Sequence, residues 1–150
     1  MKKNARLMLA SQLLNEIGII QQLVTTELNR LLPEGMHLSH FSVLNHLVRL
    51  GDGHTPNRIA SAFQVTRATM TNTLTRLSAR GMIDVRANPE DGRSKLVYLT
   101  PEGVAFHQRA YIALTPFVEG MDQNLDLENL TSVLPQLQEL REYLDNNRST

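Results

Sequence analysis

The 150-residue chain contains no cysteine and no tryptophan, and aromatic residues make up only 5% of it. Without cysteine, disulfide bonds, thiol redox switches and thiolate metal ligands are excluded. The chain also lacks a Gly-rich phosphate loop, the GxSxG and HExxH motifs, and any triad-like spacing of Ser, His and Asp. No unbroken apolar run approaches the roughly 18 residues of a membrane span. We therefore expect no enzyme, no catalytic residue, no cofactor and no membrane partner, and we expect a cytoplasmic location.

A net charge is absent as well, since 15 basic residues balance 15 acidic ones. The charges are nevertheless unevenly distributed. Residues 54–100 hold 7 Lys/Arg against 3 Asp/Glu, a net charge of +4, whereas residues 101–150 hold 3 against 8, a net charge of −5. Residues 1–53 are close to neutral, with 5 against 4. A basic segment in an otherwise neutral or acidic chain predicts an oriented attraction to a polyanion.

The first half of the basic segment predicts two short helices joined by a tight turn. Thr55 can cap a helix that starts at Pro56, because proline loses no hydrogen bond at the first helical position. Gln64 and Val65 form the turn, and Thr66 caps the second helix. The apolar residues of the second helix recur at helical spacing and form a buried stripe of Met70, Leu74 and Leu77.

The second half of the basic segment predicts a pair of strands. Gly81 ends the preceding helix, and Met82–Arg86 and Lys95–Leu99 have the composition of short strands. The connecting stretch Ala87–Ser94 contains Asn-Pro and Asp-Gly steps and therefore forms a charged loop. Helix, turn, helix, strand, loop and strand follow each other in the order of a winged helix-turn-helix. That fold places one helix in the major groove of DNA and the loop, or wing, beside it.

The second helix carries small, hydroxyl, amide and guanidinium side chains outside its buried stripe. Such side chains suit base edges and phosphates, because Asn pairs with adenine, Arg with guanine, and Thr with phosphates or a thymine methyl. In an isolated helix the same face would be an ordinary solvated surface, but its place between a turn and a wing favours DNA. The predicted contacts on this helix are Thr66, Arg67, Ala68, Thr69, Thr71, Asn72, Thr75 and Arg76.

The charged loop adds Asp91, Arg93 and Lys95 to the predicted DNA contacts. Arg93 is expected to enter the minor groove, because a narrow A·T-rich groove has an enhanced negative potential. Asp91 is expected to orient Arg93, or another arginine, through a salt bridge. The alternative is a surface hairpin whose charges have no binding role.

The stretch NPEDGRSKLVYLTPEG, from Asn88 to Gly103, resembles the wing signature of the MarR family of bacterial transcriptional regulators. That signature is D-P-x-D-x-R, followed by a strand and L-T-x-x-G; Asn88 replaces its first acid, which removes one salt bridge of the family. The helix from Thr66 to Ile83 is similar to the family's recognition helix, and the resemblance extends over essentially the whole chain. It implies a mainly α fold with a small β wing, and a homodimeric repressor released by a small, often aromatic, effector.

The two ends of the chain predict further helices. Residues 5–32 have apolar positions three and four apart, and a helix over residues 101–119 is expected to bend or end at Pro116. Asp126 caps a leucine-rich segment in which Pro135 should produce a kink. These helices hold more apolar surface than one small winged unit can cover, which favours self-association; the alternative is a monomer whose terminal helices fold back on its own core.

We interpret the chain as a single domain, 1–150, with a winged helix-turn-helix region at 36–100 and dimerisation helices at 1–35 and 101–150. A two-fold dimer would place two recognition helices on a palindromic double-stranded operator, with half-sites about 34–36 Å apart. The resemblance implies that helices from both termini interdigitate across the dimer.

The resemblance also implies an effector crevice between the dimerisation helices and the winged region. Its proposed lining is Phe41, Leu44 and Phe106, with ordinary core residues as the alternative. Some family members sense zinc through histidines and carboxylates. Candidates here are His37, His40, His46, His107, Glu27 and Glu102, but no tight ligand motif is present, since His37 is expected to precede a helix cap at Ser39. We therefore predict no metal site and keep a zinc-responsive regulator, and a winged module that docks protein, as alternatives.

Overall fold

The computed structural model describes residues 3–147, so the two ends of the predicted 1–150 domain lie outside it. Its elements, in chain order, are α1 (Lys3–Leu31), the 3-10 helix η1 (Pro33–Gly35), α2 (Leu38–Leu50), α3 (Pro56–Ala62), α4 (Arg67–Ala79), β1 (Ile83–Ala87), β2 (Lys95–Leu99), α5 (Pro101–Asn124), α6 (Leu127–Thr131) and α7 (Leu134–Asn146). The strands form a two-stranded antiparallel sheet. The predicted fold class, mainly α with a small β wing, is confirmed.

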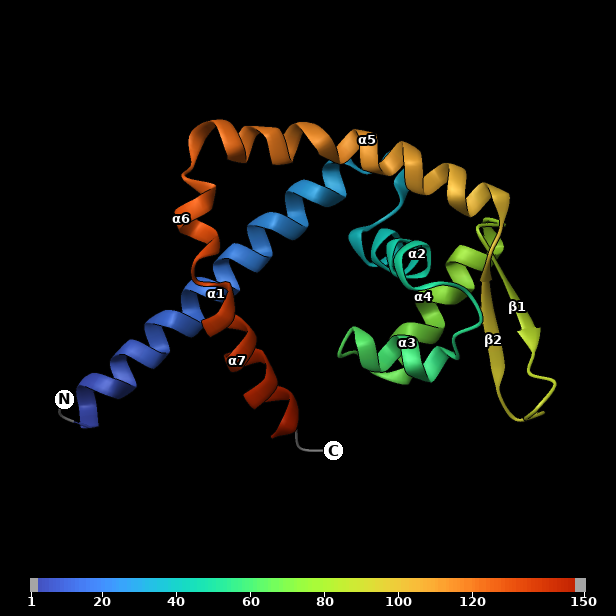
Figure 1. The fold of residues 1–150 in the computed structure, drawn as a ribbon, viewed down its shortest axis with the longest axis horizontal. Coiled ribbons are helices and arrows are strands. Elements are labelled where there is room, and N and C mark those ends of the chain that lie inside the picture. The colour runs from blue at the N-terminus through green and yellow to red at the C-terminus, as the bar shows by residue number, and fades with distance from the viewer. Residues whose placement is uncertain (1–2, 148–150) are drawn as a thin grey trace.

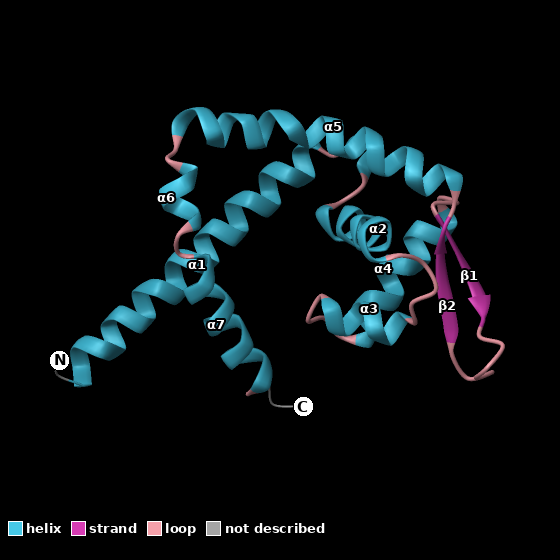
Figure 2. Ribbon diagram, in the orientation of Figure 1, coloured by secondary structure: helices cyan, strands magenta, loops and turns pink. Residues whose placement is uncertain are grey.

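The elements form a compact part and an extended part (Figures 1 and 2). The compact part contains α2, α3, α4 and the sheet, which lie together under one end of the long helix α5. The extended part contains α1, which runs diagonally away from the compact part, and α6 and α7, which descend from the far end of α5. The boundaries that we predicted for the winged and dimerisation regions stay a prediction.

The hydrophobic core lies in the compact part and joins the winged unit to α5. Its fully buried side chains come from α2, α3, α4, the sheet and the middle of α5, and include Val43, Leu44, Leu47, Ile59, Leu77, Met82, Val97 and Phe106. No residue of α1, α6 or α7 within the described chain is buried. The shared core fixes the winged unit against the first half of α5, while the terminal helices keep their apolar faces open.

The helix starts and turns of the winged unit follow the sequence prediction. The Thr55 side chain accepts a hydrogen bond from the Arg58 backbone N–H at 3.2 Å, and Thr66 accepts one from Thr69 at 3.1 Å. Gln64 occupies the left-handed region at φ 58°, which produces the tight turn between α3 and α4. Gly81 has φ 68°, a conformation that glycine adopts without the strain of a Cβ.

The start of α2 differs from the prediction. The residue before its first turn is His37, and Ser39 lies inside the helix rather than at its cap. His40 stabilises this start because its Nδ1 accepts a hydrogen bond from the His37 N–H at 2.9 Å. Asn29 of α1 accepts another from the Leu38 N–H at 2.7 Å. The neighbouring His40 and the more distant Asn29 therefore satisfy the free N–H groups, and the helix starts at Leu38, before the predicted cap.

The sequence predictions for two prolines in the C-terminal half need correction. Pro116 was expected to bend or end a helix over residues 101–119; it does not end α5, which continues to Asn124. One missing N–H removes a single hydrogen bond, and the turns on either side keep theirs. Pro135 does not kink a continuous helix either: α6 ends at Thr131, and Pro135 lies in the first turn of α7, where a missing N–H has no cost. Asp126 caps α6 as predicted, accepting from Asn129 N–H at 2.9 Å.

The sheet pairs Ile83 with Leu99 and Ala87 with Lys95, so β1 begins one residue later than predicted, because Met82 packs in the core. A third segment joins the sheet at a single bridge between His54 and Val97. The Val97 N–H donates to the His54 carbonyl at 2.9 Å. No sequence pattern predicted this bridge, which anchors the loop between α2 and α3 to the wing.

The start of α5 presses directly against the turn that follows α4. A Cβ placed on Gly103 would lie 2.0 Å from the backbone oxygen of Met82, so only glycine fits there. Thr100 caps α5 by accepting from the Gly103 N–H at 3.0 Å, and its hydroxyl donates to the Gly81 carbonyl. The glycine of the L-T-x-x-G motif is therefore explained by a close backbone contact.

Within the described chain, α1 is the one helix long and apolar enough to cross a membrane when judged by length and composition. Its apolar run is not continuous, because Gln12, Glu16 and Gln21 interrupt it. These polar side chains give the helix a mixed surface. Many of its apolar side chains are exposed, whereas Leu28 and Leu31 pack against the core.

Candidate nucleic-acid interface

The outer face of α4 is available for contact. Each of the eight residues predicted on this helix is exposed, and the stripe of Met70, Leu74 and Leu77 is buried as predicted. The sequence prediction missed one buried residue, Thr73, whose hydroxyl donates to the Thr69 carbonyl at 3.1 Å. The helix therefore has one face in the core and one face free for a ligand.

The polar groups on this face differ in what they already bond. The Thr66 hydroxyl caps the helix and donates to the Thr69 hydroxyl at 2.9 Å, and the Thr75 hydroxyl donates to the Thr71 carbonyl at 2.8 Å. These threonines offer mainly methyl groups to a partner. Within residues 3–147, no ion pair or side-chain hydrogen bond holds Arg67, Asn72 or Arg76, so these three keep free polar ends.

The wing loop is shaped by side-chain bonds to its own backbone. Asn88 accepts from the Glu90 N–H at 3.0 Å and donates to the Ser94 hydroxyl at 2.9 Å. The salt bridge expected of Asp91 is absent from the described residues; its carboxylate accepts instead from the Arg93 backbone N–H at 3.0 Å. Aspartate at a turn bonds a backbone N–H two residues on more readily than a flexible guanidinium. Asp91 therefore orders the loop and leaves the Arg93 side chain free.

Arg93 and Lys95 are both exposed at the wing. The sequence prediction missed a third basic side chain there, Arg86 of β1. Its guanidinium bonds Asp84 at 2.8 Å and lies 4.2 Å from the centre of the Tyr98 ring, a cation–π contact. The local charge count contained this residue, but only the strand register shows that it lies beside Tyr98.

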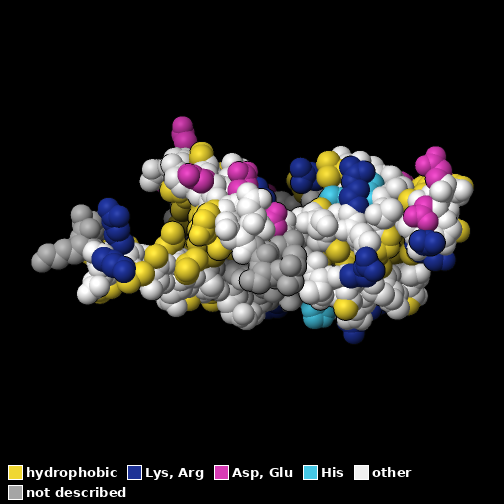
Figure 3. Space-filling model, turned by 90° about the horizontal axis from the view of Figure 1, so that it is seen from below, with side chains coloured by type: hydrophobic (Ala, Val, Ile, Leu, Met, Phe, Trp, Pro, Cys, Tyr) yellow, Lys and Arg dark blue, Asp and Glu magenta, His cyan; other side chains and the backbone are white. Residues whose placement is uncertain are grey.

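Basic and apolar side chains are unevenly distributed over the molecule. Seen from below in Figure 3, Lys and Arg side chains are spread over the half that contains the winged unit, while hydrophobic side chains gather on the half formed by the terminal helices. Two basic residues of α1 lie at its far end, outside this pattern. The basic surface coincides with the free face of α4 and the wing.

A crevice of about 470 Å³ separates α1 from the winged unit. The three residues that we proposed for an effector pocket do not line it. Leu44 and Phe106 are fully buried in the core, and Phe41 stacks on His107 with ring centres 5.4 Å apart. The crevice is lined instead by polar and apolar residues of α1, α2, the α3–α4 turn and α4, among them Gln21, Thr25, Asn29, Ser42, Phe63, Val65 and Thr69.

The histidines and carboxylates considered for zinc lie in separate places. Within residues 3–147, no group of three or more metal-binding side chains comes together. Glu27 bonds Arg30 and Glu102 bonds Arg109, while His107 bonds Asn45 at 3.0 Å.

A pair of histidines, the half-buried His46 and the buried His54, lies where α2, α3 and the sheet meet. The rings of His46 and His54 are 5.4 Å apart at nearly a right angle, and the buried His46 Nε2 and His54 Nδ1 have no hydrogen-bond partner within the described chain. Burial lowers the pKa of His46, and the positive charges of His54, Arg49 and Arg58 lower it further. Burial also lowers the pKa of His40 and of His107. The neutral forms of His40, His46 and His107 are therefore favoured in the folded protein.

Residues 34–94 match the family model described as the MarR family. The multiple antibiotic resistance protein MarR of Salmonella typhimurium is 34% identical over 111 residues, which cover 66% of this chain and 76% of that protein. Among solved structures, the PcaV transcriptional regulator from Streptomyces coelicolor in complex with its natural ligand has a TM-score of 0.74 at 23% identity, over 84% of this chain and 89% of PcaV. A mutant MarR from E. coli complexed with operator DNA has a TM-score of 0.70 at 23% identity, over 83% and 93% of the two chains.

The wing motif, the helix-turn-helix geometry and these similarities agree. The chain belongs to the MarR family of transcriptional regulators.

Proposed function

We propose that this protein is a sequence-specific regulator that binds double-stranded DNA. In this proposal α4 enters the major groove, where Arg67, Asn72 and Arg76 read bases or hold phosphates, and Arg93 enters the adjacent minor groove. The observation that carries the proposal is the exposed, unpaired polar face of α4 beside an ordered basic wing. The structural similarity to a mutant MarR solved in complex with operator DNA supports DNA binding.

The proposal includes a homodimer that binds a palindromic operator. Large apolar side chains stay exposed along α1 and the C-terminal helices, for example Leu13, Leu23 and Leu134. A groove of about 620 Å³ between α1 and α7 is lined mainly by Leu14, Ile17, Ile20, Val24, Leu137, Leu140 and Leu144. Open apolar surface of this extent is unusual in a monomer and fits a second copy of the chain.

We further propose that the protein acts as a cytoplasmic repressor and that a small aromatic effector releases it from DNA. The crevice between α1 and the winged unit is the site that fits this role, because it separates the proposed dimer helix α1 from the start of α4. A ligand there would change DNA binding only if it favoured one distance between the two parts over another. The PcaV structure with its natural ligand supports effector binding within this fold.

The test is a selection from randomised duplex DNA at two salt concentrations, followed by sequencing. The proposal expects an inverted repeat with half-site centres about 10 base pairs apart, and weaker retention at high salt. No enrichment at either salt concentration, after removal of co-purified small molecules, would contradict it and would favour a module that docks protein.

A further inference from the structure

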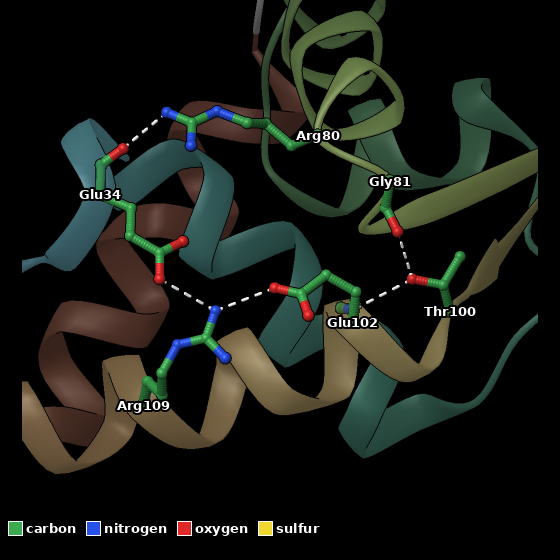
Figure 4. A network of polar contacts seen from close by, with 7 residues as sticks. Glu34, Arg80, Gly81, Thr100, Glu102 and Arg109 are labelled. Carbon is green, nitrogen blue, oxygen red and sulfur yellow. Dashed lines mark hydrogen bonds and ion pairs between the residues drawn. The ribbon is translucent and has the colours of Figure 1, made fainter.

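The C-terminal end of α4 is bonded to the segment between α1 and α2. The Arg80 guanidinium, at the end of α4, donates a hydrogen bond to the Glu34 backbone carbonyl at 2.6 Å. The Glu34 carboxylate in turn lies 3.0 Å from the guanidinium of Arg109 on α5, and Arg109 also bonds Glu102 at 2.9 Å. Figure 4 shows this chain of contacts running from α4 through Glu34 to α5.

Glu34 has an unusual backbone conformation that allows both contacts. Its φ of 62° and ψ of 25° lie in the left-handed region, which disfavours a residue with a Cβ by about 1–2 kcal/mol. Such a conformation persists where the surroundings hold it, and these positions often have a functional reason. Figure 4 shows the result: the carbonyl of Glu34 points to Arg80 and its carboxylate points to Arg109.

A second contact already joins α4 to α5. The Thr100 hydroxyl bonds the Gly81 carbonyl, and Gly103 packs against Met82, so the turn after α4 is attached to the first turn of α5. The buried stripe of Met70, Leu74 and Leu77 holds the inner face of α4 in the core. The contact of Arg109, two helical turns further along α5, adds a further attachment between the C-terminal end of α4 and α5.

We propose that Glu34 is a positioning residue that orients the recognition helix α4 relative to α5 without touching DNA. The inference rests on the proposed function, in which α4 binds DNA. Glu34 and Arg109 are 39% and 44% exposed, so their ion pair contributes little to stability. Loss of the pair is therefore expected to alter the orientation of α4 more than the stability of the fold.

The test is a charge-reversal cycle with the variants Glu34→Arg, Arg109→Glu and the double variant, which restores the pair and the net charge. The matched control is Glu102→Gln, which changes the other partner of Arg109 and leaves Glu34 in place. Each protein is measured for affinity to the selected operator, affinity to unrelated duplex, and melting temperature. We expect each single variant to lower the ratio of operator to unrelated affinity about 3- to 10-fold. The melting temperature should fall by no more than about 4 °C.

The double variant should recover the wild-type ratio, and the control should keep it. Unchanged ratios in both single variants, or a double variant as weak as the singles, would overturn the inference. A loss that follows the melting temperature would also overturn it, since it would show a merely structural role.

A separate readout distinguishes this inference from the proposed function. Should the wild-type protein select no operator, the proposed function fails, and hydrogen exchange then decides the role of Glu34. The backbone N–H groups of Arg80 and Gly81, which bond Arg76 and Ser78, should exchange faster in Arg109→Glu and return to the wild-type rate in the double variant. Equal exchange rates in all variants would overturn the inference.

Discussion

At the scale of single residues, the bonds that each polar group already makes decide which of them can bind DNA. The sequence predicted the exposed face of α4 correctly, because helical periodicity separates its two faces. It did not predict that the Thr66 and Thr75 hydroxyls form hydrogen bonds with backbone groups of α4. Nor did it predict that the Asp91 carboxylate accepts a hydrogen bond from a backbone N–H. For Phe41, Leu44 and Phe106 it left an effector pocket and ordinary core as alternatives, because helical periodicity does not separate core from pocket. Leu44 and Phe106 are fully buried in the core.

Arg76 tests the reading of bases by α4. Arg76→Ala should weaken operator binding by about 1–3 kcal/mol and relax the preference at one base pair, because its guanidinium is free to pair with guanine. Arg30→Ala, which removes an exposed arginine from α1, is the control and should keep the wild-type preference. Competition binding with single-base operator variants measures both. An equal loss on all sequences would make Arg76 a phosphate contact.

Arg93 tests the wing. Arg93→Ala should weaken binding most on operators whose flanks are A·T-rich, since a narrow minor groove attracts a guanidinium. The measurement is fluorescence anisotropy on two operators that differ only in their flanks. An affinity unchanged on both would show that the wing does not enter the groove.

We expect the stability of the protein to depend on pH, because the pKa values of His40, His46 and His107 are lowered in the folded state. The pKa of His46 is lowered in the folded protein, so the unfolded chain binds more protons below its ordinary pKa near 6.5. The free energy of unfolding should therefore have its full value above about pH 6.5 and should decrease as the pH falls below that value. Urea titrations between about pH 5 and pH 8 measure this, and His46→Gln should reduce the slope. If the free energy of unfolding of His46→Gln depends on pH as steeply as that of the wild type, the effect belongs to His40 or His107.

At the scale of secondary-structure elements, local signals predicted where helices start better than where they end. Thr55–Pro56, Thr66 and Thr100–Pro101 start α3, α4 and α5 as expected, because a cap acts through bonds within one turn. The predicted start of α2 was wrong, since the observed start depends on Asn29, which accepts from the Leu38 N–H nine residues further along the chain. Pro116 and Pro135 were misinterpreted because their cost depends on the position within a helix, and the helix ends were not known in advance.

Gly103 tests the junction of α4, β1 and α5. Gly103→Ala should lower the free energy of unfolding by about 2 kcal/mol or more, because the new Cβ would overlap the Met82 backbone oxygen. Gly120→Ala in the same helix is the matched control. Its Cβ would meet nothing within 4 Å, so the better helix propensity of alanine should stabilise by up to about 1 kcal/mol. Chemical denaturation compares the two, and equal effects would contradict the close contact.

At the scale of the whole molecule, the sequence predicted an excess of apolar surface but not the shape that presents it. The structure shows that α1, α6 and α7 contain no buried residue in the described chain, and that α1 and α7 line an open groove. Periodicity marks which side of each helix is apolar. It does not distinguish apolar faces that pack within one chain from those that pack against a second chain, since the two kinds of packing bury the same kind of surface.

Leu137 tests the dimer. Leu137→Glu should convert a dimer into single chains of 16.9 kDa, because the charge would enter the apolar groove between α1 and α7. Val48→Glu, at an exposed apolar position of α2, is the control and should leave the dimer intact. Sedimentation velocity measures both. A Leu137→Glu protein that still sediments as a dimer would remove this groove from the interface.

The central claim is that two copies of α4 and the wing bind one operator on one face of the duplex. Hydroxyl-radical footprinting of the wild-type protein on its selected operator tests this claim most directly. The account predicts two protected stretches about 10 base pairs apart, with further protection in the flanking minor grooves that is lost in Arg93→Ala. A single protected stretch, or uniform weak protection that disappears with moderate salt, would contradict it.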